Sequence, residues 1–596
     1  MTGAIFQINS YLFFSDYNGS HCSDTFNWYL LSTWCYEAIS YLARFLDPRI
    51  AQISQDRQSA VIYSSPCSHG VRSTAAFVGE ARTSTILPSQ LSAPHPKNPT
   101  GRQFSHTINP DIAMASDMPI ANSASAADID IEQSKPNRSI DIEAASLSRD
   151  TIFPKSRLSV CSLPPEILSW IFELGQAIDI GKSRDDDSDS DDASVHTSFE
   201  VIVSHVSSHF RNVAIGTRKL WRSIDITMLQ SMESMAAYIA RSDGCGLHVR
   251  LDFGGQEPRA EDLAKFRVVL AHTNRYHRLA IDIVNEATDT PIIRQFCDIG
   301  ASMLEHLSIA VEEAQGSAVF NTGVFWGGAE KLSFVRLRGL AMPLFRPPLN
   351  VVTTLHLDQT IPLPIHFTTF LQILTASPSL AHLSVYGDIV SSLTWPSTVL
   401  PIDLPNLRSL RICGISGTIY SSLLLSINAA GLDSLVLKDT QEFDLENFWA
   451  SPNVFKFPQL HHLTFCDFEF SSHAYADVFR AFPTIKKFTT SYSSTTPTIL
   501  SLLAQPVEGL DIPWPDLHTL SFLLNLYDDD LIKNVVRNRE AAGCPLVRLR
   551  LGTSLHPSAL RQYNWLQENI ILEKVDMLEH WPTPDFHSDE DDVLFS

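Results

Sequence analysis

Basic side chains recur at alternating positions in the C-terminal half of the chain, at a spacing that would place them on one face of a β-sheet. Guanidinium and ammonium groups on such a face bind carboxylates or phosphates through charge-assisted hydrogen bonds. The chain has 44 basic and 66 acidic residues, yet eight basic and two acidic residues occupy these positions. They are Arg336, Arg338, Arg411, Lys438, Lys487, Arg548, Arg550 and Lys574, against Asp358 and Asp576. The pattern predicts a surface that binds an acidic or phosphorylated protein segment; chance and an error in strand register are the alternatives.

Catalytic chemistry has little support in the sequence. Residues 175–183 resemble a phosphate-binding loop, but five residues separate the two glycines where that motif has four, and acidic residues follow closely. The motifs Gly-x-Ser-x-Gly and His-Glu-x-x-His do not occur, and His462 and its neighbours lack metal-ligand spacing. The sequence therefore predicts no enzymatic activity, no metal and no cofactor.

The elements that would position the basic residues are repeated. A motif of the form Leu-x-x-Leu-x-(Leu, Ile, Val or Phe) recurs roughly every 27 residues from about position 300 onward. In the unit 380–386, Leu383 and Val385 are two residues apart, which is the strand period, so both point to one face. The middle anchors of the units are Leu307, Val335, Leu355, Leu383, Leu410, Leu435, Leu463, Phe488, Leu520, Leu549 and Val575. Two looser units precede them, around Val249 and Leu279.

Such units must stack to be stable. Ordering one unit costs roughly 1–2 kcal/mol per residue, whereas each of its apolar anchors returns only about 1.5–3 kcal/mol, so neighbouring units have to bury each other's faces. Over residues 300–580 the period and the strand motif resemble the longer variants of the leucine-rich repeat family. The resemblance implies an α/β solenoid, with a curved parallel sheet inside and helices outside. A single α/β domain with strands at similar spacing is the alternative.

Two apolar helices are predicted before the repeats. Residues 163–175 begin with Leu-Pro-Pro-Glu, which suits the first turn of a helix, and Gly175 fits its end. Residues 203–214 form a second amphipathic pattern, and Leu220 and Trp221 then precede a short strand. The two apolar stripes consist of Ile167, Leu168, Ile171 and Phe172, and of Val203, Val206, Phe210 and Val213.

This order of elements resembles the F-box, most closely in the F-box proteins with degenerate leucine-rich repeats that are abundant in mushroom-forming fungi. In that family the F-box docks on a Skp-family adaptor, which joins a cullin ubiquitin ligase, while the repeats capture a protein substrate. About 45 residues cannot bury all of their apolar positions internally, so a partner helix would cover the remainder. The motif match gives the docking role to Leu163, Pro164, Ile167, Leu168, Ile171, Val203, Val206, Leu220 and Trp221. Phe172, Phe210 and Val213 are expected in the internal core.

One feature departs from the family. Residues 179–200 form an insertion between the two helices where family members have a short loop, and six of the eight residues at 185–192 are acidic. The insertion is expected to remain solvated. It either crowds the adaptor or leaves docking unchanged, and Ser188 and Ser190 lie in a setting that suits a kinase favouring acidic sites.

The predicted organisation has four parts. Residues 1–155 are expected to be mostly disordered, 158–226 to form the F-box with its insertion 179–200, 227–580 to form the solenoid, and 581–596 to be an acidic tail. The net charge of −22 argues against nucleic acid and anionic membranes as partners. Nine cysteines without a Cys-x-x-Cys pair suit reduced thiols in the cytoplasm or nucleus. The expected function is substrate recognition for a Skp–cullin–F-box ligase; the alternative is a repeat scaffold unrelated to ubiquitin.

Overall fold

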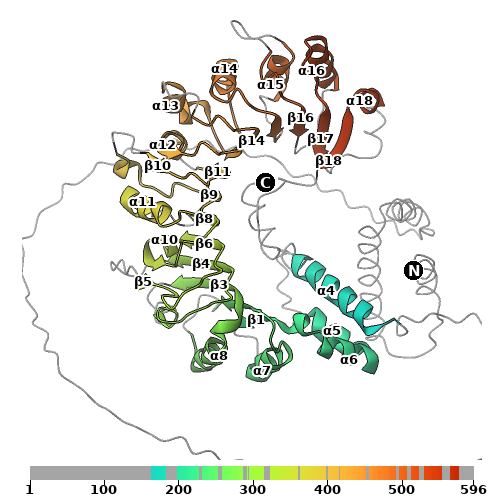
Figure 1. The fold of residues 1–596 in the computed structure, drawn as a ribbon, viewed down its shortest axis with the longest axis vertical. Helices are drawn as coiled ribbons and strands as arrows, with labels where there is room; N and C mark the ends of the chain where they lie inside the picture. Colours follow the sequence, from blue (N-terminus) through green and yellow to red (C-terminus); the bar gives the residue numbers. More distant parts are fainter. Residues whose placement is uncertain are drawn as a thin grey trace, which may run out of the picture. The chain divides into compact units, whose positions relative to one another are not determined.

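Strands and helices alternate over most of the chain that can be described (Figure 1). The computed structural model describes residues 163–182, 198–226, 231–252, 258–285, 292, 294–313, 322–359, 361, 363–396, 401–414, 417–451, 456–491, 496–505, 512–522, 529–552 and 564–575. The predictions for residues 1–155, for the acidic run with Ser188 and Ser190, and for the tail 581–596 lie outside these residues. The predicted α/β class is confirmed.

The first described elements are helical. Helix α4 (Pro165–Lys182) starts at a proline, whose missing N–H is not needed in the first turn. Helices α5 (Phe199–Val206) and α6 (Ser208–Gly216) follow, and the 3₁₀ helix η2 (Arg218–Trp221) leads into the sheet.

Two predictions about these helices are wrong. Helix α4 does not end at Gly175 but continues to Lys182. Gly175 serves packing instead, because a Cβ atom at this position would lie 2.3 Å from Cζ of Phe199. Residues 203–214 are two helices rather than one, because Ser207 is extended and its side chain accepts a hydrogen bond from the Phe210 N–H, which caps α6.

The remaining described chain is organised around a single parallel sheet of fourteen strands, which follow one another in chain order. The strands are β1 (Ser223–Ile226), β2 (Leu247–Asp252), β3 (Tyr276–Asn285), β4 (His306–Glu313), β6 (Phe334–Gly339), β8 (Thr354–Asp358), β9 (His382–Tyr386), β11 (Ser409–Cys413), β13 (Ser434–Lys438), β14 (His462–Cys466), β15 (Lys487–Thr490), β16 (Thr519–Phe522), β17 (Arg548–Gly552) and β18 (Ile571–Val575). Two short pairs lie beside it: β5 (Thr322–Gly323) with β7 (Phe345–Arg346), and β10 (Ile402–Asp403) with β12 (Ile427–Asn428).

The strand register confirms the predicted row of anchors from Leu307 to Leu549, since each anchor pairs with the next. The last anchor is wrong. Leu549 pairs with Leu572, not with Val575, so the register prediction for β18 is off by three residues. Lys574 therefore pairs with Leu551, and Glu573 takes the position opposite Arg550. Asp576 lies outside the described residues.

Helices cover the face of the sheet that carries the anchors (Figure 1). They are α7 (Met232–Arg241), α8 (Ala260–Leu270), α10 (Ala341–Leu344), α11 (Phe367–Thr375), α12 (Thr418–Ser426), α13 (Glu446–Trp449), α14 (Ser472–Ala481), α15 (Thr496–Leu503), α16 (Asp529–Ala541) and α18 (Asn564–Asn569). Side chains such as Phe370 on α11 and Val478 on α14 share one apolar core with anchors such as Leu383 and Leu463. The opposite face of the strands, which carries the basic residues predicted from sequence, is called the polar face below.

Candidate interaction surfaces

The helical unit, defined as α4, α5, α6 and η2, has an apolar core of its own. Phe172 of α4 and Phe210 of α6 meet edge to face with ring centroids 5.3 Å apart, and both are buried. Val213 is buried beside them. The expectation that these three side chains are internal core is confirmed.

A buried carboxylate joins this unit to the helix that follows. Glu200 of α5 accepts a hydrogen bond from the Tyr238 hydroxyl of α7 at 2.5 Å and another from the Gln176 amide of α4 at 2.9 Å. Gln176 also donates to the Leu220 carbonyl of η2 at 2.9 Å. Burial and the Glu200 carboxylate raise the pKa of Tyr238, so the hydroxyl remains a donor. One buried network therefore holds four helices together.

Trp221 provides a second set of contacts between the helical unit and α7. Its indole N–H donates to the Ala214 carbonyl at 2.8 Å, and its ring meets the Tyr238 ring edge to face at 5.1 Å. The guanidinium of Arg241, at the end of α7, lies 4.2 Å from the indole centroid, which is a cation–π contact. The adjacent Leu220 is fully buried.

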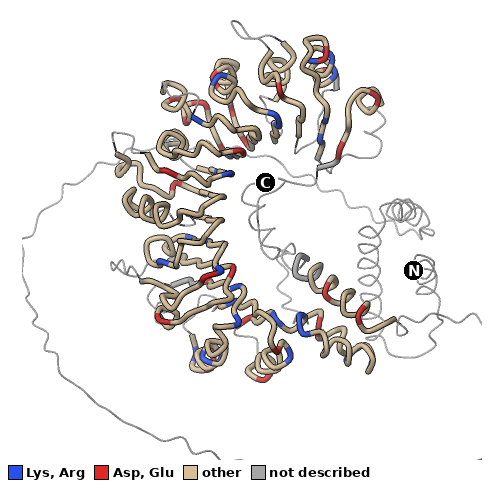
Figure 2. Tube along the Cα trace, viewed as in Figure 1, with Lys and Arg blue, Asp and Glu red and all other residues tan. Residues whose placement is uncertain are grey.

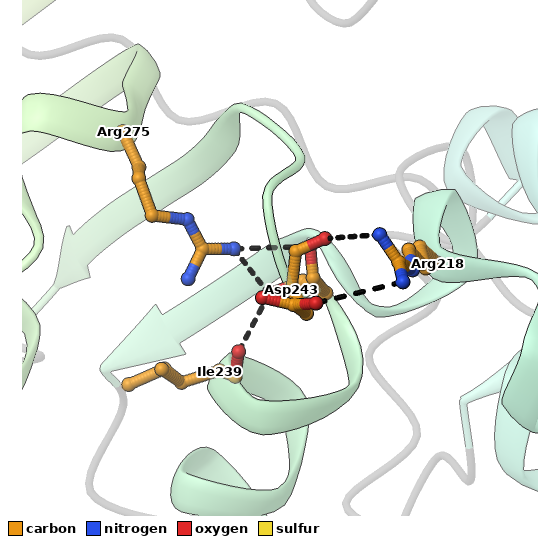
Figure 3. A network of polar contacts seen from close by, with 5 residues as sticks. Arg218, Ile239, Asp243 and Arg275 are labelled. Carbon is orange, nitrogen blue, oxygen red and sulfur yellow. Dashed lines mark hydrogen bonds and ion pairs between the residues drawn. The ribbon is translucent and has the colours of Figure 1, made fainter.

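The turn after α7 is held from both sides (Figure 3). From η2, Arg218 donates to the Asp243 carbonyl at 3.2 Å and lies 3.5 Å from the Asp243 carboxylate. From η3 (Thr273–Arg275), Arg275 donates to the Ser242 carbonyl at 3.0 Å and to its hydroxyl oxygen at 2.9 Å. These contacts connect the helical unit to the first strands of the sheet, and sequence reasoning missed the roles of Glu200, Arg218 and Arg275.

The nine residues predicted to dock on an adaptor are divided by burial. Five are buried within the chain: Leu168, Ile171, Val203, Leu220 and Trp221. Leu163, Ile167 and Val206 are half-buried, and Pro164 is exposed. A buried side chain cannot contact a partner, so the docking prediction keeps only these last four as accessible residues.

Sequence reasoning missed the most exposed apolar residue of the helical unit. Trp170 has 61% of its surface exposed. It lies three residues after Ile167 and four before Leu174, a spacing that places all three on one side of α4. This spacing is visible in the sequence, but it overlaps the stripe Ile167–Leu168–Ile171–Phe172, in which every residue except Ile167 is buried.

Figure 2 shows where basic and acidic residues lie along the chain. Two groups of charged residues on the polar face have the same arrangement. In each, two arginines separated by one residue lie on one strand, and a carboxylate lies on the next strand, opposite the second arginine. We call them the central triad, Arg336, Arg338 and Asp358, and the terminal triad, Arg548, Arg550 and Glu573. Each triad has two cations and one carboxylate, so each has a formal charge of +1.

Arg336 and Asp358 of the central triad are buried, and Arg338 is half-buried. Nε of Arg336 donates to Asp358 at 2.5 Å, and Nε of Arg338 lies 3.4 Å from the same oxygen. His356 on β8 lies opposite Arg336 in the strand register. Burial, and then the charges of Arg336, Arg411 and Arg338, hold the pKa of His356 well below its ordinary value, so this imidazole is neutral.

The terminal triad is more accessible at Arg548 and Glu573, whereas Arg550 is half-buried like Arg338. Nε of Arg550 donates to Glu573 at 2.9 Å, and Nε of Arg548 lies 3.8 Å from the other carboxylate oxygen. The Arg548 side chain is 52% exposed, against 2% for Arg336. Strand β18 is the last strand of the described sheet, which explains why the triad beside it is open to solvent.

Three of the remaining predicted basic residues lie on strands between the triads. Arg411 is buried on β11, and Lys487 is half-buried on β15. Lys438 on β13 lies 3.7 Å from Asp467, an acid that follows β14 and was missed in the sequence count. The predicted ratio of eight basic to two acidic residues is therefore lowered, because Lys574 pairs with Leu551 of the anchor face, and Glu573 and Asp467 add carboxylates beside the basic residues.

The first strands carry three acids together with two arginines, Arg250 and Arg278. Asp225, Asp252 and Asp282 lie on β1, β2 and β3 around Arg250, whose guanidinium lies 3.2 Å from Asp282 and 3.4 Å from Asp252. Burial raises the pKa of Asp225 to about 6 despite the nearby Arg250. The first strands are therefore less favourable for an acidic ligand than the terminal triad, whose formal charge is +1.

Comparison with known proteins leaves the family open, because neither a protein-family model nor a curated protein matches the chain. Among the described residues, no helix combines the length and apolarity that crossing a bilayer requires. Within the same part of the chain, no three His, Cys, Asp or Glu side chains are arranged to share a metal ion.

Proposed function

We propose that this protein is the substrate-recognition subunit of a Skp–cullin–F-box type ubiquitin ligase. In this proposal the helical unit is an F-box that docks on a Skp-family adaptor, and the layered sheet is a leucine-rich-repeat solenoid that binds a protein substrate. The observation that carries the proposal is the exposed Trp170 on the same side of α4 as the half-buried Ile167. Apolar side chains exposed in a helical stripe favour a partner helix or groove.

The contacts in Figure 3 suit this function, because a recognition subunit must hold its substrate at a fixed place relative to the ligase. Arg218 of η2 and Arg275 of η3 donate hydrogen bonds to the same turn after α7, and Trp221 packs on Tyr238. A joint made from several side chains resists bending more than a simple linker does.

The proposed substrate is an acidic or phosphorylated segment that binds the polar face at the terminal triad. Arg548 and Arg550 present guanidinium groups that can form bidentate hydrogen bonds to a phosphate or carboxylate. The proposed chemistry is binding alone, and ubiquitin transfer belongs to other subunits. A ligase subunit of this kind acts in the cytoplasm or the nucleus.

A binding experiment with a purified Skp-family adaptor tests the proposal. Immobilised adaptor should retain the wild-type chain. It should not retain the Trp170→Asp variant, because the substitution places a charge in the docking stripe. Leu393→Asp is the matched control, since Leu393 is 93% exposed far along the sequence, and it should be retained like the wild type. Leu168→Asp and Ile171→Asp are unsuitable, because both side chains are buried and the variants would unfold the helical unit.

The alternative is a repeat scaffold that binds no ubiquitin-ligase adaptor. The burial of Leu168, Ile171, Val203, Leu220 and Trp221 favours it, since these docking residues already serve the chain's own core. Failure of the adaptor to retain the wild-type chain, with the chain folded, would support the scaffold and reject the ligase function.

A further inference from the structure

The helix-covered side of the sheet contains a cavity of about 670 Å³. It lies among η5 (Glu442–Asp444), α13 and α14, and its lining consists of Glu442, Phe443, Glu446, Trp449, Ala450 and Asp477. The contact between α13 and α14 and the hydrogen bond from the Ser471 N–H to Glu442 at 3.2 Å hold its walls together. This cavity is on the opposite side of the sheet from the basic polar face.

An aromatic side chain in the cavity wall is left open to solvent. Phe443 is 65% exposed, although its neighbours Asp444 and Leu445 are buried. Trp449 is half-buried and is fixed by ring contacts with Phe448 at 5.2 Å and Phe482 at 5.9 Å. An exposed phenyl ring and a fixed indole in the lining of one cavity offer two aromatic surfaces to a ligand.

Carboxylates surround these rings. Asp477 is engaged with Arg480 at 2.7 Å, and Glu442 with the Ser471 N–H. Glu446 is exposed and, among the described residues, forms no ion pair. With three carboxylates and one arginine, the cavity and its edge have a formal charge of −2, which attracts a cation and repels an acidic segment.

We propose that this cavity binds an arginine side chain of a basic segment in a partner protein. A planar guanidinium stacks on aromatic rings and forms bidentate hydrogen bonds with a carboxylate, whereas an ammonium group does neither as well. In the complex, the guanidinium lies against Phe443 or Trp449 and donates to Glu446. The inference goes beyond the proposed ligase function, because it needs neither the adaptor nor the polar face.

Saturation-transfer NMR with the full chain tests the inference. The probes are acetylated Gly-Arg-Gly amide and the same peptide with citrulline, which keeps the shape of arginine but has no charge. The arginine peptide should give a saturable signal, and the citrulline peptide should bind about tenfold more weakly or not at all. The substitutions Glu446→Gln and Phe443→Ala should each lower the affinity for the arginine peptide by about five- to tenfold.

A matched variant separates the cavity from the general negative charge of the chain. Glu568→Gln removes one exposed carboxylate from α18 and should leave binding unchanged. All variants alter exposed side chains, so their melting temperatures should equal that of the wild type. Equal binding of the arginine and citrulline peptides, or equal losses for Glu446→Gln and Glu568→Gln, would overturn the inference. The adaptor experiment is unaffected by either result.

Discussion

The central and terminal triads have the same chemistry and the same register but different surroundings. Both place two arginines on one strand and a carboxylate opposite the second arginine on the next. In the central triad the carboxylate is 2% exposed, and strands continue on both sides. In the terminal triad the carboxylate is 31% exposed and belongs to the last described strand.

The difference shows that residue type alone does not assign a role on this face. A buried ion pair has lost its hydration and is costly to break, whereas an exposed pair exchanges freely with water and ligands. The central triad therefore acts in stability, and the terminal triad is available for binding. The predictions below test this division.

Removing the central carboxylate should have the largest effect. Asp358→Asn keeps the size of the side chain but removes the negative charge that Arg336 and Arg338 share, so two cations repel each other in a buried site. We expect a loss of about 3–5 kcal/mol in the free energy of unfolding. Urea denaturation followed by circular dichroism measures it, and a loss below about 1 kcal/mol would mean that the triad is not structurally important.

The second effect is a dependence of stability on pH beside the central triad. His356 is neutral in the folded chain, because its pKa is held well below the ordinary value, whereas in the unfolded chain it binds a proton below about pH 6.5. Since the unfolded state then binds more protons, stability should fall as the pH decreases below that value. The melting temperature of His356→Gln should decrease less than that of the wild type between pH 7 and pH 5. His382, whose pKa burial also lowers, should account for part of the remaining decrease.

The regular part of the fold could be predicted from the sequence. Leucine-type anchors two residues apart, repeated at a nearly constant interval, identified one strand per unit and the row from Leu307 to Leu549. The prediction failed at β18, where Leu572 and Val575 offer alternative anchors three residues apart. A period of two cannot decide between them, because the choice depends on pairing with Leu549 and Leu551, which is a tertiary contact.

The candidate sites were less predictable, because they depend on burial. An apolar stripe in α4 does not reveal whether the chain or a partner covers it, so Leu168 was assigned to docking and Trp170 was missed. Partners in long-range ion pairs are also invisible in one sequence. Glu573 and Asp467 could not be assigned to Arg550 and Lys438 before the register was known.

The third prediction concerns binding at the terminal triad. The double substitution Arg548→Glu and Arg550→Glu should weaken the binding of a fluorescent eight-residue peptide that carries two phosphoserines. The expected loss in affinity is at least about tenfold, or about 1.4 kcal/mol. The control is Arg211→Glu with Arg267→Glu, which makes the same charge change at exposed positions on α6 and α8. Fluorescence anisotropy at two salt concentrations measures both. Equal losses in the two double variants would mean that net charge, rather than the terminal triad, determines binding.

The smallest effect, and the sharpest contrast, comes from removing the terminal carboxylate. Glu573→Gln is the counterpart of Asp358→Asn, yet we expect a loss of less than about 1 kcal/mol in the free energy of unfolding, because the partly exposed arginines are solvated when the charge is removed. Binding of the phosphopeptide, in contrast, should become stronger. Glu573 competes with an anionic ligand for Arg548 and Arg550, so removal of its charge should increase the affinity for the phosphopeptide severalfold. If Glu573→Gln instead destabilised the chain as much as Asp358→Asn, the terminal triad would be structural as well, and the distinction by burial would be wrong.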